Sequence, residues 1–422
     1  EPHQYEGDQG VPISSFARRA AFALAFLDYN VVGSGAIQPD SQMLWVRNVN
    51  DRLNKLAPFL SYDADPYPVA VDGKAVWVVD GYTTSSRFPY AQAIGAVQRS
   101  RQSGLSDSDN YVRNSVKAVV DAYTGDVTFY IVDDEDPILK AWQSAFPNLF
   151  TPGAEMPDVI REHLRYPEDL FRIQTDIYSK YRLDPGLFFQ RDGNAWSVAQ
   201  APSATPANNT RTAATENDTG APSAAANTFA TESNAERFTP YYTILDTSKP
   251  GDEPQEEFVI LRPFVPFSTG DTRTQLQAYM TASSDPDTYG QLTTYVVQER
   301  NGQLPDGPLR VAGNAESQSE ISDRITLDNQ DAGGTKVRFG DLQLVPVGDG
   351  LIWVRPYYVA VPQETGTVRS VSEFRFVIVS NGNNSVLART ITEGVRRLFP
   401  GFEGNVGDVL GAPSEASDVV PV

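Results

Sequence analysis

One internal segment departs so far from globular composition that it divides the chain. Thirty of the 35 residues at 201–235 are Ala, Thr, Asn, Pro, Ser or Gly, and Phe229 is the one aromatic residue among them. Such a segment buries too little apolar surface to offset the entropy that ordering would cost, so it is predicted to be disordered. It fits two arrangements equally well, a linker between two domains or a long insertion between two strands of one domain.

The flanking sequence then predicts four regions in the chain of 422 residues. An α+β region covers 1–196, and the disordered linker or loop insertion covers 197–237. A strand-rich α+β region covers 238–400, and a flexible acidic tail covers 401–422. The length alone is enough for two or three domains, so this division is consistent with it.

Helical and strand patterns alternate through both α+β regions. Apolar spacing and capping residues predict helices at 12–28, 49–57, 137–146, 167–181, 272–282, 319–327 and 392–399. Apolar alternation around short turns predicts hairpins at 69–79 and 116–132, and strands at 241–245, 258–261, 294–297, 342–347, 351–358 and 374–379. Hairpins dominate over strand–helix–strand crossovers, so the predicted fold class is α+β, with mainly antiparallel sheets and interleaved helices.

The net charge of −20 limits the classes of partner. Binding to a phosphate backbone needs clustered Lys and Arg, and here 54 acidic residues outnumber 34 basic ones, so nucleic acid is not expected as a partner. The same charge argues against adsorption on an anionic membrane surface. No stretch approaches 18 consecutive apolar residues, so no membrane-spanning helix is expected within this sequence.

Two residue types that carry much of enzyme chemistry are scarce. The chain has no cysteine, which excludes disulfides, zinc–thiolate sites and thiol nucleophiles, and it has only two histidines, His3 and His163. A Ser–His–Asp triad has one of these two imidazoles to use, and multi-histidine metal centres are excluded. No nucleophile elbow, phosphate loop or zinc-protease motif is present, and no cofactor is predicted.

Seven stretches of sequence carry a family resemblance. They are VPISSFARRAAFA at 11–23, APFL at 57–60, VDG at 71–73, DGYTTSSRFPY at 80–90, NYVRNSVKAVVDAY at 110–123, HLRYPEDLF at 163–171 and IWVRPYY at 352–358. This set resembles uncharacterised protein family 0182, large bacterial multi-pass membrane proteins that are frequent in actinobacteria. The resemblance implies transmembrane helices outside this fragment, a soluble region on the extracytoplasmic side of the cell membrane, and no established activity.

Polar residues within these stretches are the candidate site residues. The candidates for carboxylate catalysis, which needs no local motif, are Asp80, Asp121, Glu168 and Asp169. The candidates for ligand binding are Tyr82, Arg87, His163, Arg165 and Tyr166. Both stretches also have structural interpretations: 80–87 as a turn with internal hydrogen bonds, and 163–169 as a helix start whose acids complement the helix dipole.

Four consecutive acids at 133–136 offer the oxygen ligands that Ca²⁺ takes. The metal candidates are Asp133, Asp134 and Asp136. The alternating acids and central glycine of an EF-hand are absent, and Pro137 is suited to the first position of a helix. The sequence therefore favours a structural role over a Ca²⁺ site: these acids cap the helix and form the solvated segment that precedes it.

The favoured function is that of a non-enzymatic ectodomain that binds a protein or cell-envelope component beside its own transmembrane helices. The alternative is a carboxylate-based enzyme or transport accessory that acts on an envelope glycan or lipid-linked substrate. It requires two carboxylates about 5–10 Å apart in a cleft. A third interpretation is a peptidase-regulating module, because 121–127 is similar to the strand–turn–strand signature of PepSY-type modules.

Overall fold

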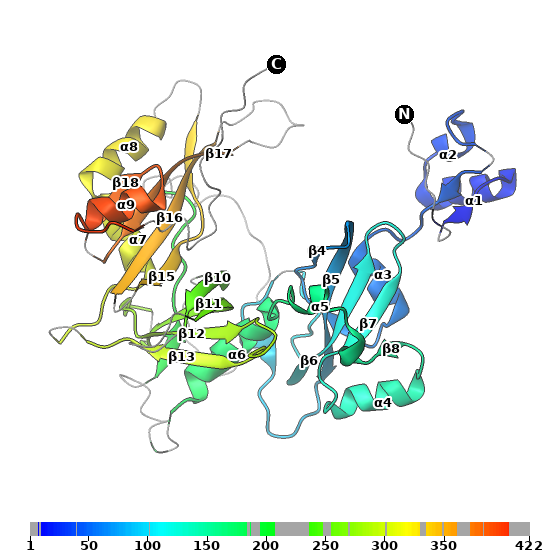
Figure 1. Ribbon diagram of the computed structural model, residues 1–422, viewed down its shortest axis with the longest axis horizontal. Helices are drawn as coiled ribbons and strands as arrows, with labels where there is room; N and C mark the ends of the chain where they lie inside the picture. The colour runs from blue at the N-terminus through cyan, green and yellow to red at the C-terminus, as the bar shows by residue number, and fades with distance from the viewer. Residues whose placement is uncertain are drawn as a thin grey trace. The chain divides into compact units, whose positions relative to one another are not determined.

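The computed structural model describes residues 7, 10–38, 40–100, 102–183, 186, 195–206, 236–247, 255–268, 271–299, 302–329, 335–347, 350–360, 372–382 and 384–404 (Figure 1). The chain divides into two compact units, Glu1–Ile173 and Gln174–Val422, here called the first and second units. Helices interleave with mostly antiparallel sheets, which confirms the predicted α+β class. In the part of the chain that is described, no helix combines the length and apolar character needed to cross a bilayer.

A six-stranded sheet is the centre of the first unit. Its strands are β3 (Ser61–Tyr62), β4 (Tyr67–Val71), β5 (Lys74–Ser85), β6 (Tyr111–Asp121), β7 (Val127–Ile131) and β8 (Phe150–Thr151). They run in the order β3-β5-β6-β7-β8, with β4 also paired to β5, and only β7 and β8 pair in parallel. Both predicted hairpins are confirmed. Asp72 and Gly73 turn the first with φ of 48° and 77°, as a tight hairpin turn requires.

Helices cover this sheet and complete its core. They are α3 (Val49–Leu56), α4 (Pro137–Ala145) and α5 (Asp158–Arg161), with 3₁₀ turns at Ile94–Ala96 and Gly153–Glu155. Helix α6 (Glu168–Tyr181) follows them and spans the boundary between the two units. Leu53 of α3 and Leu139 of α4 are both fully buried in one cluster with Phe129 of β7. These three helices, α3, α4 and α6, lie where the sequence predicts them, because apolar spacing and end signals agree at each.

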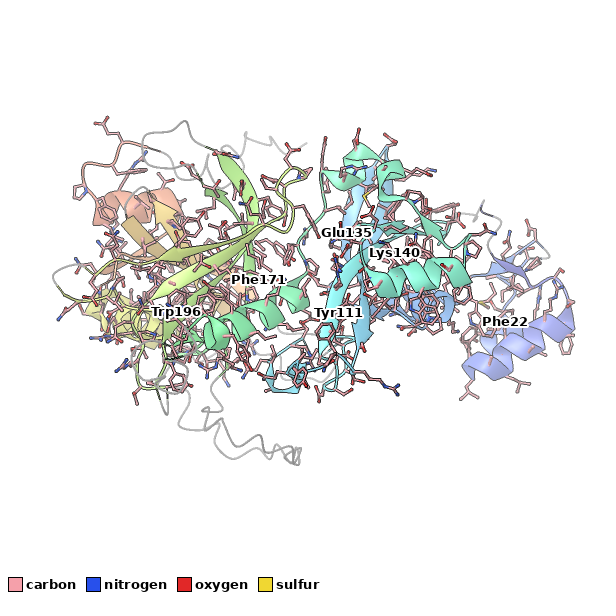
Figure 2. The ribbon with its side chains drawn as sticks, turned by 90° about the horizontal axis from the view of Figure 1, so that it is seen from below. Phe22, Tyr111, Glu135, Lys140, Phe171 and Trp196 are labelled. Carbon is pink, nitrogen blue, oxygen red and sulfur yellow. The ribbon has the colours of Figure 1, made fainter. Side chains whose placement is uncertain are left out.

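Residues 10–47 form a small substructure of the first unit, here called the amino-terminal lobe. It contains β1 (Val11–Pro12), α1 (Phe16–Phe26), α2 (Asn30–Gly33) and β2 (Gln42–Met43). Its core is formed by Ile13, Phe22 and Val31, and Phe22 is labelled on α1 in Figure 2. Helix α1 is shorter than predicted, because Leu27 adopts a left-handed φ of 53° and ends it.

The second unit contains two five-stranded antiparallel sheets. The first has β9 (Trp196–Val198), β10 (Tyr241–Asp246), β11 (Glu256–Pro266), β12 (Ala278–Ser283) and β13 (Leu292–Val296). The second has β14 (Lys336–Phe339), β15 (Gln343–Val347), β16 (Gly350–Ala360), β17 (Ser372–Ser380) and β18 (Ser385–Ala388). Both sheets supply side chains to one core cluster, with Leu261 and Tyr279 from the first and Leu344 and Trp353 from the second.

Three helices, α7 (Pro308–Ser317), α8 (Ser319–Asn329) and α9 (Ile391–Leu398), pack beside the second of these sheets. The predicted helix at 272–282 is wrong, since 278–283 is the strand β12. All six of its residues are buried between two neighbouring strands, so it lacks the polar–apolar alternation of a half-buried strand. Helix α7 was not predicted, and α9, which is capped by Thr390, begins one residue before its predicted start.

The polar segment begins and ends within the second unit. The amide of Ala201 donates to the carbonyl of Glu236 at 2.8 Å, and Gln200 forms an antiparallel bridge with Arg237. The described residues on either side of the segment therefore lie side by side within that unit. The two compact units meet between Ile173 and Gln174, inside α6. Of the segment predicted to be disordered at 197–237, the structure describes 197–206 and 236–237, which include the end of β9. Residues 207–235 and the tail beyond 404 lie outside the described residues.

Candidate functional site

A buried ion pair lies in the middle of the sheet of the first unit. Asp80 of β5 and Lys117 of β6 are direct cross-strand partners, and the Lys117 ammonium contacts Asp80 Oδ1. Their side chains are 4% and 0% exposed. Lys117 Nζ also donates to the carbonyl of Arg165 at 2.9 Å. Burial raises the pKa of Asp80, and the charge of Lys117 opposes that shift.

A second carboxylate, Asp63, follows β3 and joins this pair. Its amide donates to the carbonyl of Asp80 at 2.9 Å. Its Oδ2 accepts hydrogen bonds from the Tyr82 hydroxyl and, at 3.3 Å, from the amide of Asp169. Burial raises the pKa of Asp63 from 3.8 to about 7, and the charges of Asp80 and Asp169 raise it further, against the hydrogen bond from Tyr82. The Asp63 carboxyl therefore keeps its proton at mildly acidic pH and titrates near neutrality.

The third carboxylate is Asp169, in the first turn of α6. Its side chain is fully buried, and Oδ1 accepts a hydrogen bond from the Ser100 amide at 3.0 Å. Its Oδ2 accepts no hydrogen bond from any residue that the structure describes. We call Asp63, Asp80, Tyr82, Lys117 and Asp169 the buried polar cluster. It sets three carboxyl groups against one ammonium, an arrangement that favours protonation of one acid.

The four catalytic candidates do not form an open carboxylate pair. Asp80 and Asp169 lie in the buried polar cluster, and Glu168 forms an ion pair with Arg172 at 2.6 Å. Burial raises the pKa of Glu168, with Arg172 opposing the shift. Asp121 lies four residues along β6 from Lys117, roughly 13 Å at the usual rise per strand residue. There its Oδ1 accepts the amides of the next turn, which lower its pKa.

The binding candidates separate into buried and exposed groups. Tyr82 is fully buried in the cluster, and Tyr166 is also buried. Arg165 is half-buried, with its guanidinium 4.7 Å from the centre of the Tyr67 ring, and its amide bonds to the Tyr67 hydroxyl at 3.0 Å. Arg87 and His163 are exposed, and His163 Nδ1 lies 2.7 Å from the carbonyl of Val159.

The metal candidates Asp133, Asp134 and Asp136 directly precede α4, and Asp136 is its N-terminal cap. Asp136 caps this helix by accepting the Ile138 amide at 3.0 Å, and it also accepts hydroxyl protons from Thr83, Ser115 and Tyr111. Burial would raise the pKa of Asp136, but these hydrogen bonds outweigh it and lower that pKa. Asp133 pairs with Arg113 at 2.5 Å, and Asp134 is exposed. Tyr111 and Glu135 are labelled in Figure 2. The described residues contain no group of three acids or histidines placed to hold a metal ion.

Two members of the buried polar cluster, Asp63 and Lys117, were not among the candidates from sequence. Lys117 carried a signal, because it interrupts the apolar run from Val116 to Val120 and every residue of that run is buried. A lysine in such a strand is almost never fully buried without a partner. Asp63 carried no comparable signal, because an acid after a short strand is typical of a turn.

Comparisons with known proteins place the chain in a family. The model of an uncharacterised protein family, UPF0182, matches residues 1–328. A UPF0182 protein of Methanospirillum hungatei is 36% identical over 398 residues, which cover 94% of this chain and 39% of the relative. Relatives in Desulforamulus reducens and Frankia casuarinae are each 35% identical, and the matches cover 94% and 86% of this chain and 37% and 33% of the relatives.

The relatives are found in bacteria and archaea, a wider range than actinobacteria. This chain spans about two fifths, or less, of the length of those relatives. No solved structure matches it. The family model covers more than half of the chain and the identities exceed 30% over most of its length. The chain therefore belongs to the uncharacterised protein family UPF0182.

Proposed function

We propose that this chain is the extracytoplasmic part of a multi-pass membrane protein, and that it is a non-catalytic module that binds a protein or a cell-envelope component. The observation that carries the proposal is an exposed, ordered loop at 86–91, directly after β5. Tyr90 in this loop is 109% exposed and has a φ of 60°. A bulky residue in the left-handed region costs conformational energy, and such strain is concentrated at sites of recognition.

The loop is held in place before any partner arrives. Asn110 accepts the amide of Phe88 at 3.0 Å and donates to its carbonyl at 2.9 Å. The Phe88 ring stacks on Tyr111, with 5.7 Å between ring centres. Arg87 and Tyr90 are thereby presented on a rigid support, and Tyr and Arg are the side chains that most often dominate binding energy. Because the loop is already ordered, binding costs less conformational entropy.

The placement of the carboxylates favours a non-catalytic role for this chain. Glycoside hydrolysis needs two carboxyl groups that face one substrate bond. Asp80 and Asp169 are at most a few per cent exposed, and Glu168 is held by Arg172. These acids therefore stabilise the fold, and the alternative of a carboxylate-based enzyme has no geometric support among them.

Site-specific photo-crosslinking tests the binding proposal. A photoreactive phenylalanine analogue replaces Tyr90 in the full-length protein, expressed in its own membranes, and Tyr123 is replaced in a matched control. Tyr123 is also an exposed tyrosine of the first unit, 46% exposed, in the β6–β7 turn. We expect a discrete adduct from position 90 that Arg87→Ala weakens, and none from position 123. Equal adducts from both positions, or no adduct from position 90, would contradict the proposal.

The location on the extracytoplasmic side has its own test, for which this part of the protein offers a background without cysteine. Tyr123→Cys in the full-length protein introduces one thiol at an exposed turn. We expect a membrane-impermeant maleimide to label it in intact cells, with the parent protein as the background. Labelling that appears only after the cells are broken open would place the chain on the other side of the membrane.

A further inference from the structure

The segment that leads from α5 into the first turn of α6 is attached to the buried polar cluster by hydrogen bonds. We call this segment, residues 163–169, the α5–α6 segment. The carbonyl of Arg165 accepts the Lys117 ammonium at 2.9 Å, and the amide of Asp169 donates to Asp63 Oδ2 at 3.3 Å. The attachment of this segment to the sheet therefore depends on charged side chains that are buried beside it.

The buried ionisable groups around Asp63 come from three elements. Strand β5 contributes Asp80 and Tyr82, β6 contributes Lys117, and α6 contributes Asp169, and each of these residues is at most 3% exposed. Ionisation of Asp63 therefore leaves three carboxylates beside one ammonium in surroundings that exclude water. Buried charges of like sign disfavour one another, and the entry of water is the remaining way to stabilise them.

The groups at the edge of the cluster add no further compensation for Asp63 except one amide. Asp65 is exposed, and its amide donates to Asp63 Oδ1 at 3.1 Å. Glu168 of α6 forms its own ion pair, with Arg172 at 2.6 Å. Asp169 Oδ2 is fully buried and accepts no hydrogen bond from the residues that the structure describes. A water molecule that enters the cluster therefore finds an open acceptor there.

We propose that the α5–α6 segment is a pH-sensitive closure, which covers the cluster while Asp63 is protonated and opens locally, to admit water, when Asp63 ionises. The segment is the part that moves, because its backbone is irregular from 164 to 167, whereas β5 and β6 pair with strands on both sides. Leu164 and Tyr166 are buried, so the open form is a minor one whose population rises with pH. The opening frees the first turn of α6, the helix that spans the boundary between the two units.

The direction of the change follows from the proton on Asp63. Its pKa is raised to about 7 by burial and by the charges of Asp80 and Asp169, so the closed form binds this proton more tightly than the open form does. The closed form is therefore favoured at mildly acidic pH, and the open form gains as the pH rises through neutrality. This inference goes beyond the proposed function and does not depend on it.

Hydrogen exchange of the purified chain at pH 6 and pH 8, followed by mass spectrometry, tests the inference. We expect protection factors, which correct for the pH dependence of intrinsic exchange, to fall about tenfold at residues 164–171. That size follows from a pKa of about 7 in the closed form and the ordinary 3.8 in the open form. Asp63→Asn should abolish the change. Asp121→Asn is the matched control and should keep it, because the turn amides lower the pKa of Asp121.

Three results would overturn the inference. The first is parent protection at 164–171 that is the same at pH 6 and pH 8, and the second is an Asp63→Asn chain that keeps the tenfold change. The third is equal protection of 164–171 and of β7 at pH 8, which would mean that the segment opens only when the whole sheet unfolds. If Asp63→Asn does not fold, the first and third results still decide. None of the three concerns the adduct at position 90, so the proposed function stands or falls separately.

Discussion

Replacing Lys117 with methionine is expected to lower the free energy of unfolding by about 3–5 kcal/mol, the usual cost of removing one partner of a buried ion pair. Lys117 is fully buried, and it is the only ammonium or guanidinium in the buried polar cluster as defined here. Without it, Asp80 keeps its place beside Asp63 with no compensating charge. Urea denaturation of the purified chain, followed by circular dichroism, measures the change.

The double variant Asp80→Asn/Lys117→Met separates the ion pair from simple loss of packing. Because it removes both charges, it should recover about 0.5–3 kcal/mol of the stability that the single lysine variant loses, the usual coupling energy of residues in contact. Arg310→Met gives the matched control, since its ion pair with Asp306 is half exposed and such pairs contribute little. A Lys117→Met protein as stable as the parent, or a double variant no more stable than the single variant, would contradict a stabilising ion pair between Asp80 and Lys117.

The proton on Asp63 gives the second large effect. Its pKa is raised from 3.8 to about 7, so between these values the folded chain keeps a proton that the unfolded chain releases. This contribution to stability is therefore fully present below pH 4, is lost as the pH rises from 4 to about 7, by about 4 kcal/mol in all, and changes no further at higher pH. Asp63→Asn mimics the protonated acid, so it should be the more stable protein at pH 8 and nearly equal to the parent at pH 4.

Unfolding at pH 4, 6 and 8 measures this difference. Asp121→Asn is an informative control because the pKa of Asp121 is lowered by the turn amides, which reverses the sign. That variant should lose stability relative to the parent at pH 8 and approach it as the pH falls. If Asp63→Asn follows the parent at every pH, Asp63 does not hold the proton.

Local signals in the sequence predicted the local structure well. The Asp72–Gly73 turn fixed one hairpin, and Pro137 after Asp136 fixed the start of α4. In each case the turn or cap residue and the apolar pattern favour the same structure, which is the condition under which sequence-based prediction succeeds. The strand β12 was mistaken for a helix because it is buried on both faces, and a short apolar run has no period of its own.

The candidate site was less predictable because it is assembled from distant segments. Asp63 accepts a hydrogen bond from the amide of Asp169, which lies 106 residues away in the sequence. Asp136 accepts hydrogen bonds from hydroxyl groups of two different strands. The sequence singles out the stretches at 80–90 and 163–171 as candidate sites. The acids of these stretches, however, are buried or ion-paired, so the residues proposed as catalytic candidates hold parts of the fold together. Only the pairing of β5 with β6 reveals that Lys117 is the partner of Asp80.

The most direct test of the central claim, that the buried carboxylates serve the fold while the exposed loop serves binding, compares two variants in one assay. The full-length protein carrying Asp63→Asn or Tyr90→Ala is treated with a bifunctional amine crosslinker in its own membranes, and the adducts are compared with those of the parent. The account predicts the parent pattern for Asp63→Asn and a loss of adduct for Tyr90→Ala. A folded Asp63→Asn protein that loses its adduct, beside a Tyr90→Ala protein that keeps it, would contradict the account.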